Sequence, residues 1–186
     1  PEATRYHYDL VGNLDWQRYA NGLVTDYTYD GLNRLEKLSH FSGAFDDLPL
    51  PAPGERSLFA EYDYELLPDG RRDGVHEKQW DPDTWGAGGE FRETYVDWVY
   101  DDLGRLVEEH FDFEYDGSFE PDRSTTYAFD LVGNRVKRTL DDDGDGGVDE
   151  AIAYLYDAND RLFQEDADLD GDQLPDRTTQ YAYDVT

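Results

Sequence analysis

A short motif recurs seven times along the chain: an aromatic residue, any residue, a second aromatic residue and then an acid. Successive copies begin 21 to 36 residues apart, so the motif is constant while the segments between copies vary in length. This repetition predicts an array of one supersecondary unit. The aromatic pairs are Tyr6/Tyr8, Tyr27/Tyr29, Tyr62/Tyr64, Trp98/Tyr100, Tyr127/Phe129, Tyr154/Tyr156 and Tyr181/Tyr183.

The motif predicts a β-strand that runs into a turn. Two aromatics at positions i and i+2 lie on one face of a strand. The acid that follows them suits the start of a turn, because a carboxylate can accept hydrogen bonds from backbone amides two residues on. Gly, Asn or Asp comes next, and an apolar residue such as Leu35 or Leu106 then starts a return strand. Each unit is therefore predicted to be a β-hairpin, and the fold class all-β.

Two segments depart from the regular unit. Residues 41–57 include a proline-rich stretch and predict an extended, non-strand excursion. Residues 68–93 are rich in Gly, Asp and Trp and predict a second long excursion. The motif resumes after each, so neither marks a domain boundary. We expect one repeat array over residues 1–186, cut from a longer protein.

Residues 27–35 and 98–106 resemble the YD repeat of the Rhs family, whose pattern is Y-x-Y-D-x-x-G-R-L. Residues 6–14 and 127–136 match with Gly-Asn in place of Gly-Arg, and residues 62–70 match less well because Glu65 replaces the Asp. The resemblance covers nearly the whole chain. It implies hairpins joined into a curved, spiral antiparallel sheet, like the hollow shells that enclose toxin cargo in bacteria and the related shell of teneurin receptors.

This resemblance implies a structural, enclosing role in a secreted or cell-surface bacterial protein. Six complete units are too few to close a shell, so the segment would be a partial wall. Its expected partners are neighbouring repeats of the full-length protein, together with an enclosed cargo or a cell-surface glycan.

Two acidic loops carry the pattern of a calcium site. When Asp141 or Asp168 is numbered as position one, carboxylates stand at positions one, three, five and nine of the loop. Position seven would add a backbone carbonyl as a further ligand. Calcium takes six to eight oxygen ligands in flexible geometry, which this pattern can supply. The EF-hand is excluded because position twelve is not Glu. The predicted ligands are Asp141, Asp143, Asp145, Gly147 and Asp149 in the first loop, and Asp168, Asp170, Asp172, Leu174 and Asp176 in the second.

A third, degenerate loop has the same place in its own unit. Its first acid lies 14 residues after the first aromatic, as in the other two loops. Its candidate ligands are Asp112, Glu114, Asp116, Ser118 and Glu120. The sequence therefore predicts two Ca²⁺ sites and leaves a third open.

Composition excludes several other functions. The net charge of −29 is opposite to what phosphate neutralisation requires, so nucleic acid is not an expected partner. The chain has no cysteine and no apolar run of about 20 residues, which excludes disulfides and gives no expectation of membrane insertion. The four histidines show no metal-ligand spacing and the serines no nucleophile elbow, so we do not expect an enzyme.

The sequence thus predicts a non-enzymatic structural segment of a calcium-stabilised YD-repeat shell. The alternative is a calcium-dependent carbohydrate- or protein-binding adhesion module. That alternative depends on Trp80 and Trp85, whose rings would stack on sugars or meet another protein if exposed. If those rings instead cover the sheet edge or core, they carry no binding function.

Overall fold

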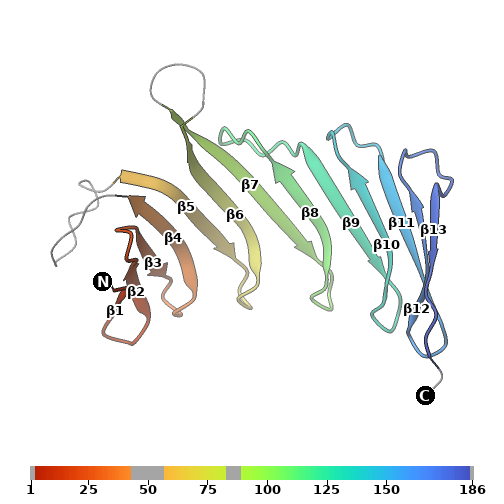
Figure 1. Ribbon diagram of the computed structural model, residues 1–186, viewed down its shortest axis with the longest axis horizontal. Helices are drawn as coiled ribbons and strands as arrows, with labels where there is room; N and C mark the ends of the chain where they lie inside the picture. The colour runs from red at the N-terminus through yellow and green to blue at the C-terminus, as the bar shows by residue number, and fades with distance from the viewer. Residues whose placement is uncertain (1–2, 43–56, 83–88, 185–186) are drawn as a thin grey trace. The chain divides into compact units, whose positions relative to one another are not determined.

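The described residues form thirteen β-strands in a single antiparallel sheet, in which every strand pairs with its neighbours in the sequence. A computed structural model describes residues 3–42, 57–82 and 89–184 (Figure 1). The predicted all-β array of hairpins is confirmed. The strands are β1 Arg5–Tyr8, β2 Leu14–Arg18, β3 Val24–Tyr29, β4 Leu35–Ser42, β5 Ser57–Leu66, β6 Arg72–Asp81, β7 Glu90–Tyr100, β8 Leu106–Asp112, β9 Arg123–Phe129, β10 Arg135–Asp141, β11 Glu150–Tyr156, β12 Leu162–Asp168 and β13 Arg177–Gln180.

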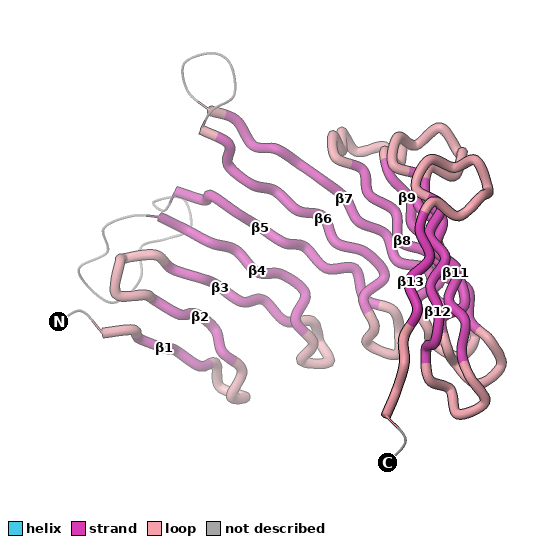
Figure 2. The backbone as a smooth tube through the Cα atoms, turned by 45° about the vertical axis from the view of Figure 1, so that its right-hand side comes forward, coloured by secondary structure: helices cyan, strands magenta, loops and turns pink. Residues whose placement is uncertain are grey.

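Within this sheet the chain divides into two compact units. The first comprises Pro1–Tyr95 with Glu114–Gly117, and the second comprises Val96–Phe113 with Ser118–Thr186. In both units strands alternate with short turns and connecting loops (Figure 2). The described residues include no helix long and apolar enough to span a membrane.

One turn chemistry ends most of the hairpins, and Asp30 illustrates it. Its backbone N–H donates to the carbonyl of Arg34 at 2.9 Å, while its carboxylate accepts the N–H groups of Leu32 and Arg34 at 2.8 and 2.9 Å. The fourth turn residue, Asn33, takes a positive φ of 60°. The same backbone bonds recur at Asp9, Asp101, Asp130 and Asp157. The acid of the motif is therefore a turn anchor, as predicted.

In two of these hairpins an arginine that closes the turn also bonds the turn of the next hairpin. The Arg34 guanidinium bonds Asp30 at 2.7 Å and reaches the carbonyl oxygen of Leu67 at 2.8 Å. In the second unit, Arg105 bonds Asp101 at 2.7 Å and the Asp130 carbonyl at 3.2 Å. The arginine of the Y-x-Y-D-x-x-G-R pattern thus satisfies its own turn and fixes the neighbouring one.

The hairpin of β5 and β6 corrects one motif assignment. The sequence placed its acid at Glu65, but the turn bonds start two residues later, with the Leu67 N–H donating to the Arg71 carbonyl at 2.8 Å. Leu67 therefore occupies the anchor position, and Tyr64 rather than Tyr62 is the first aromatic. The missing carboxylate comes from Asp69, which accepts the Arg71 N–H at 3.1 Å and the Arg71 side chain at 2.8 Å.

The predicted excursion over residues 68–93 is wrong for most of its length. β6 fills Arg72–Asp81 and β7 starts at Glu90, leaving residues 83–88 outside the described part. β6 pairs with β5 from Ala60↔Gln79 to Leu66↔Arg72, and this pairing overrides the weak strand propensity of its Gly and Asp residues. Of the other excursion, residues 43–56 also lie outside the described part, between β4 and β5.

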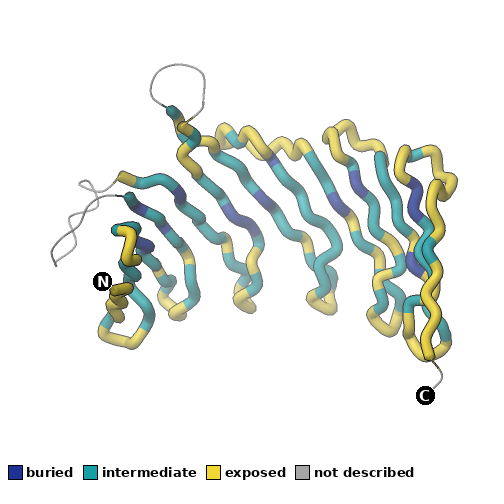
Figure 3. The backbone as a smooth tube through the Cα atoms, viewed as in Figure 1, coloured by how far each residue is buried: buried dark blue, intermediate teal, exposed yellow. Residues whose placement is uncertain are grey.

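Among the described residues the buried side chains lie within the strands, including the strand ends at Val24, Asp112 and Asp168, while the hairpin turns are mostly exposed (Figure 3). In the first unit Val24 and Phe41 form a small core to which Leu58 adds. In the second unit Leu140, Tyr154 and Ala167 are buried. Few of the described side chains are fully buried. Contacts between neighbouring hairpins must therefore contribute much of the stability of the sheet.

Candidate metal centres

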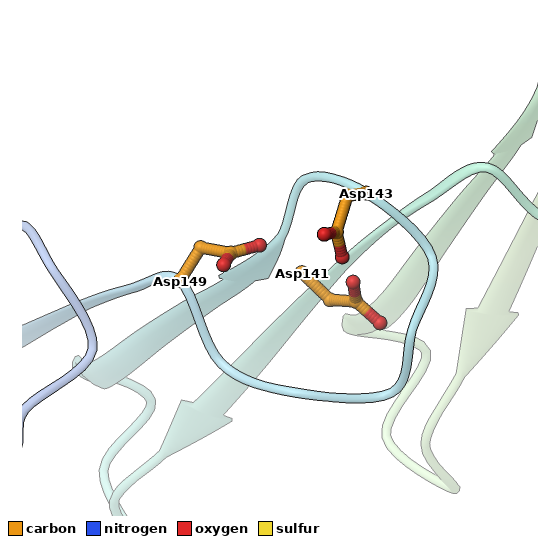
Figure 4. A group of neighbouring side chains, drawn as sticks. All are labelled: Asp141, Asp143 and Asp149. Atoms are coloured by element: carbon orange, nitrogen blue, oxygen red, sulfur yellow. The ribbon is translucent and has the colours of Figure 1, made fainter.

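The two best-matched acidic loops lie where one hairpin passes to the next. Asp141 is the last residue of β10 and Asp168 the last of β12, so each loop starts directly from a strand. In the first loop, carboxylate oxygens of Asp141, Asp143 and Asp149 lie within 4.8 Å of one another (Figure 4). In the second, the same holds for Asp168, Asp170 and Asp176. We refer to these two sets as the Asp triads.

The first carboxylate of each loop organises the backbone around it. Asp141 accepts the N–H groups of Gly144 and Gly146 on its two oxygens, at 2.8 and 2.9 Å. Asp168 does the same with Gly171 and Gln173, at 2.9 Å each. Asp168 is only 8% exposed, so its charge is held at the base of the loop rather than in solvent.

The last carboxylate closes each loop through two hydrogen bonds. The Asp149 N–H donates to the Leu140 carbonyl at 2.8 Å, and its carboxylate accepts the Asp142 N–H at 2.7 Å. Asp176 repeats both bonds, with Ala167 and Leu169, at 2.8 and 2.7 Å. We call Asp149 and Asp176 the closing aspartates. Their bonds bring the two ends of the loop together beside the next strand.

Neighbouring loops also pack directly against each other. Gly171 has a φ of 72°, and a Cβ placed on it would lie 2.3 Å from the carbonyl oxygen of Val148 in the first loop. Gly144 has a φ of 71°, and a Cβ there would lie 2.6 Å from the Pro121 carbonyl oxygen. Position four of each loop therefore requires glycine for two reasons: its backbone conformation and the contact with the preceding loop.

The predicted position-five ligands lie outside the triads. The Asp145 carboxylate accepts the Gly147 N–H at 2.6 Å, and that of Asp172 accepts the Leu174 N–H at 2.8 Å. Each therefore caps its own loop. Ligation by Asp145 and Asp172, and by the carbonyls of Gly147 and Leu174, stays a prediction.

The third loop closes at a residue that the sequence reasoning missed. The Asp122 N–H donates to the Phe111 carbonyl at 2.8 Å, and its carboxylate accepts the Phe113 N–H at 2.7 Å. These are the two bonds of a closing aspartate. Asp122, Asp149 and Asp176 lie 27 residues apart, each immediately before a strand, and this spacing could have identified Asp122.

The other predicted residues of the third loop are divided between the two units. Asp112 is buried, at 4% exposure, and accepts the Glu120 N–H at 3.1 Å. Glu114 and Asp116 belong to the first unit, whereas Asp112, Ser118 and Glu120 belong to the second. The metal-like clusters found among the described residues come from the other two loops, and a third site stays a prediction.

Both Asp triads could bind a metal ion. Each places three carboxylates close together, and their mutual repulsion would be relieved by a cation. The oxygen-only ligand set favours a hard cation over zinc or copper. The described histidines lie elsewhere, and each has its own partner: His7 with Asp15, His40 with Thr25, His76 with Glu93 and His110 with Ser124.

No known protein family matches the sequence, and no curated protein does. Among solved structures, a chain of the Photorhabdus luminescens Tc holotoxin pore matches over 96% of this chain with a TM-score of 0.51 and 14% identity. This chain spans only 10% of the length of that one. A TcdB2-TccC3 crystal structure aligns with 97% of this chain and 12% of its own length, at 12% identity and a TM-score of 0.30. A second TcdB2-TccC3 crystal structure aligns with 87% of this chain and 11% of its own length, at 13% identity and a TM-score of 0.32. Both TM-scores are too low to support an argument. The fold of this chain is therefore similar to that of part of a Tc holotoxin chain, in agreement with the fold that the resemblance to the Rhs/YD-repeat family predicts.

Proposed function

We propose that this chain is a non-enzymatic wall segment of a YD-repeat shell in a larger secreted or cell-surface bacterial protein, and that Ca²⁺ stabilises it. The observation that carries the proposal is the repeated tie between hairpins. Each of the two well-matched loops combines an Asp triad, a closing aspartate and a glycine contact with the loop before it. The wall's partners would be further repeats of the same protein and whatever the completed shell encloses.

The proposed role of calcium follows from where the charges lie. The connections between hairpins hold converging carboxylates, while the sheet itself is held by backbone pairing and aromatic packing. Without a cation, repulsion within each triad opposes loop closure. A cation that binds only the folded loop adds stability as RT ln(1 + [Ca]/Kd), about 2.7 kcal/mol at a hundredfold excess over Kd. Calcium would thus replace the disulfides that this chain cannot form.

The ligand set favours calcium over magnesium. Magnesium requires nearly ideal octahedral geometry and releases its waters reluctantly. Three carboxylates on one loop, with backbone carbonyls as further ligands, suit the larger ion, which accepts a more variable geometry. Loops of modest affinity would be filled at extracellular calcium concentrations, which agrees with a secreted or surface location.

Scanning calorimetry in calcium and in chelator, at matched ionic strength, tests the proposal. We expect a higher melting temperature in calcium and a smaller effect of magnesium. Asp141→Asn should lose most of the calcium effect of the first loop. Asp142→Asn is the matched control, because it removes the same charge from the same loop but from a side chain that faces Arg123 at 3.2 Å. An unchanged melting temperature after thorough chelation, or equal losses in both variants, would contradict a calcium site.

A further inference from the structure

A pocket lies on one face of β10, β11 and β12, within the second unit. Its volume is about 600 Å³, within the range of roughly 300–1,000 Å³ typical of small-ligand sites. The three strands supply its floor. The loops that follow β10 and β12 leave the strands at the same end and line that end of the pocket (Figure 1).

Two alanines of β11 form the centre of the floor. Ala153 pairs with Lys137 on β10 and with Asp166 on β12, while Ala151 pairs with Asp168 on β12. Residues two apart in a strand share a face, so these pairs form two parallel rows across the strands. All five residues line the pocket. The short alanine side chains keep the floor low between the charged residues on either side.

The row through Ala153 carries an unpaired positive charge on its β10 side. The other cross-strand neighbour of Lys137 is Ala128, so an alanine flanks this lysine on both neighbouring strands. Within the described part of the chain, the Lys137 ammonium group has no ion-pair or hydrogen-bond partner. An exposed cation without a partner is unexpected in a chain of net charge −29.

The same row carries a negative charge on its β12 side. Among the described residues, the partners of the Asp166 carboxylate are neutral: it accepts the Thr178 hydroxyl at 2.6 Å and the Gln164 amide at 2.8 Å. A carboxylate has about four lone-pair sites, so Asp166 can accept a further donor. Lys137 and Asp166 therefore present opposite charges to the pocket without pairing with each other.

The spacing of these two charges selects the size of a ligand. Paired strands place Cα atoms about 5 Å apart, so Lys137 and Asp166 are separated by roughly 10 Å across Ala153. Side chains of strands stand nearly perpendicular to the sheet, which carries this separation up to the charges. A charge-assisted hydrogen bond of about 2.8 Å on each side leaves roughly 4 Å between them. The ammonium nitrogen and carboxylate oxygens of one α-amino acid are roughly 3–3.5 Å apart.

The loop end of the pocket provides apolar surroundings. Ala151 is closer to the loops than Ala153, and Val148 of the first loop and Pro175 of the second also line the pocket. Asp168 lines this end as well, but each of its oxygens accepts a backbone N–H of its own loop at 2.9 Å. A ligand centred over Ala153 could therefore extend an apolar side chain over Ala151 toward these two loop residues.

We propose that this pocket binds a free α-amino acid with an apolar side chain. Its carboxylate pairs with the Lys137 ammonium group, and its ammonium group pairs with the Asp166 carboxylate. The two separated charges select a zwitterion, because an ion of a single charge would satisfy only one of them. The charged row belongs to the strands, so this recognition rests neither on the wall-segment role nor on a bound cation.

Titration calorimetry of the full chain with L-leucine, in calcium and in chelator, tests the site. We expect a Kd near or below about 1 mM. Leucine methyl ester lacks the carboxylate charge and N-acetyl-leucine lacks the ammonium charge, so each should bind at least about tenfold more weakly. Leucyl-leucine should also bind more weakly, because a second residue moves its terminal charges roughly 3.5 Å further apart.

Variants of the floor test the same contacts from the side of the protein. Lys137→Met and Asp166→Asn each remove one charge and keep the size of the side chain, and should weaken leucine binding at least about tenfold. Lys137→Arg keeps the charge and should retain most of the affinity. Ala153→Ile raises the floor at an exposed strand position, where a β-branched residue is favoured, so it should block binding without unfolding the sheet.

Asp160→Asn is the matched control for Asp166→Asn. It removes the same charge from the turn between β11 and β12, outside the pocket, and should leave leucine binding unchanged. The proposal is overturned if leucine does not bind at about 10 mM in either buffer, if the ester or the N-acetyl compound binds as tightly, or if the floor variants bind like the parent. Leucine binding with a melting temperature that chelation leaves unchanged would support this pocket and contradict the calcium sites, so the two proposals can be rejected separately.

Discussion

The hydroxyl of Tyr156 donates to the backbone carbonyl of Arg135 in the preceding hairpin, at 3.0 Å. Tyr29 makes the same bond to Leu14 at 3.0 Å, and Tyr183 to Leu162 at 2.8 Å. The acceptor is always the first residue of a return strand, next to the point where the ladder register shifts. The second aromatic of the motif therefore links successive hairpins as well as packing on the sheet.

Replacing Tyr156 with Phe removes this link and keeps the ring. We expect a loss of about 0.5–1.5 kcal/mol in the free energy of unfolding, measured by urea denaturation, because one hydrogen bond is lost. The chain offers the reverse substitution as a control. Phe129 stands at the equivalent position of its own hairpin, and Phe129→Tyr should leave stability unchanged or raise it. Equal stability of Tyr156→Phe and the parent would show that the hydroxyl bond contributes nothing.

Gly171→Ala should destabilise the protein through the contact between loops. The added Cβ would meet the Val148 carbonyl oxygen at 2.3 Å, in a backbone conformation that L-residues disfavour. Gly146→Ala is the matched control, because Gly146 has a φ of 85° but nothing within 4 Å of the added carbon. Gly146→Ala should cost about 1 kcal/mol and Gly171→Ala clearly more. Similar melting temperatures for the two variants would mean that the loops do not support each other.

Asp149→Asn should separate the two roles of a closing aspartate, which are to close the loop through a hydrogen bond and to ligate a cation. The Asn side-chain oxygen can still accept the Asp142 N–H, so the loop should close as before in chelator. In calcium the variant should lack most of the first loop's share of the gain in melting temperature, because a charged ligand of that loop is missing. Asp122→Asn, in the loop without a described triad, should show a smaller calcium-linked change. A large loss for Asp149→Asn in chelator alone would assign this carboxylate a purely structural role.

The turn anchors should make the fold sensitive to acid. The hydrogen bond from the Arg161 side chain, followed by backbone N–H bonds, lowers the pKa of Asp157 below its ordinary value of 3.8. Backbone bonds from Arg34 and Arg105 head the causes that lower the pKa values of Asp30 and Asp101. A lowered pKa means that the unfolded chain binds protons first as the pH falls. The contribution of these groups is therefore complete above the unfolded pKa and is lost as pH falls through the folded value.

Melting temperatures measured from about pH 6 down to about pH 2 in chelator should fall mainly below about pH 4. Asp157→Asn should flatten this decline, since the group no longer titrates. Asp160→Asn is the control: it lies in the same turn and accepts a bond only from the Asn134 side chain at 3.1 Å. An identical pH profile for Asp157→Asn and the parent would exclude this anchor as a source of the acid sensitivity.

The sequence was informative wherever one short segment decides the structure. The pair Tyr27/Tyr29 with Asp30 and Asn33 contains a strand face, a turn anchor and a positive-φ residue within seven positions, and the hairpin follows from them. The β5–β6 hairpin was misplaced by two residues because Tyr62 and Tyr64 imitate the motif while Leu67 occupies the anchor. In this turn Asp69 supplies the carboxylate that accepts the Arg71 N–H, in place of an acid at the anchor position. The repeat pattern does not predict that replacement.

The candidate sites were only partly visible from the sequence. The alternating Asp residues predicted the two triads, but Asp122 was missed because its loop has two extra residues, which moved the closing position beyond Glu120. The contact of Gly171 with Val148 joins two loops that are distant in sequence, so nothing near Gly171 predicts it.

The closing bonds have a consequence for engineering and for evolution. Asp112 and Asp122 are ten positions apart and Asp141 and Asp149 eight, yet both pairs of loop ends are joined by the same two bonds, one between backbone groups and one from a backbone N–H to the closing carboxylate. Length added between the fastened ends leaves the following strand in register. These connections are therefore natural graft points, where a foreign peptide of several residues can be displayed at the ends of the strands while the hairpins keep their register.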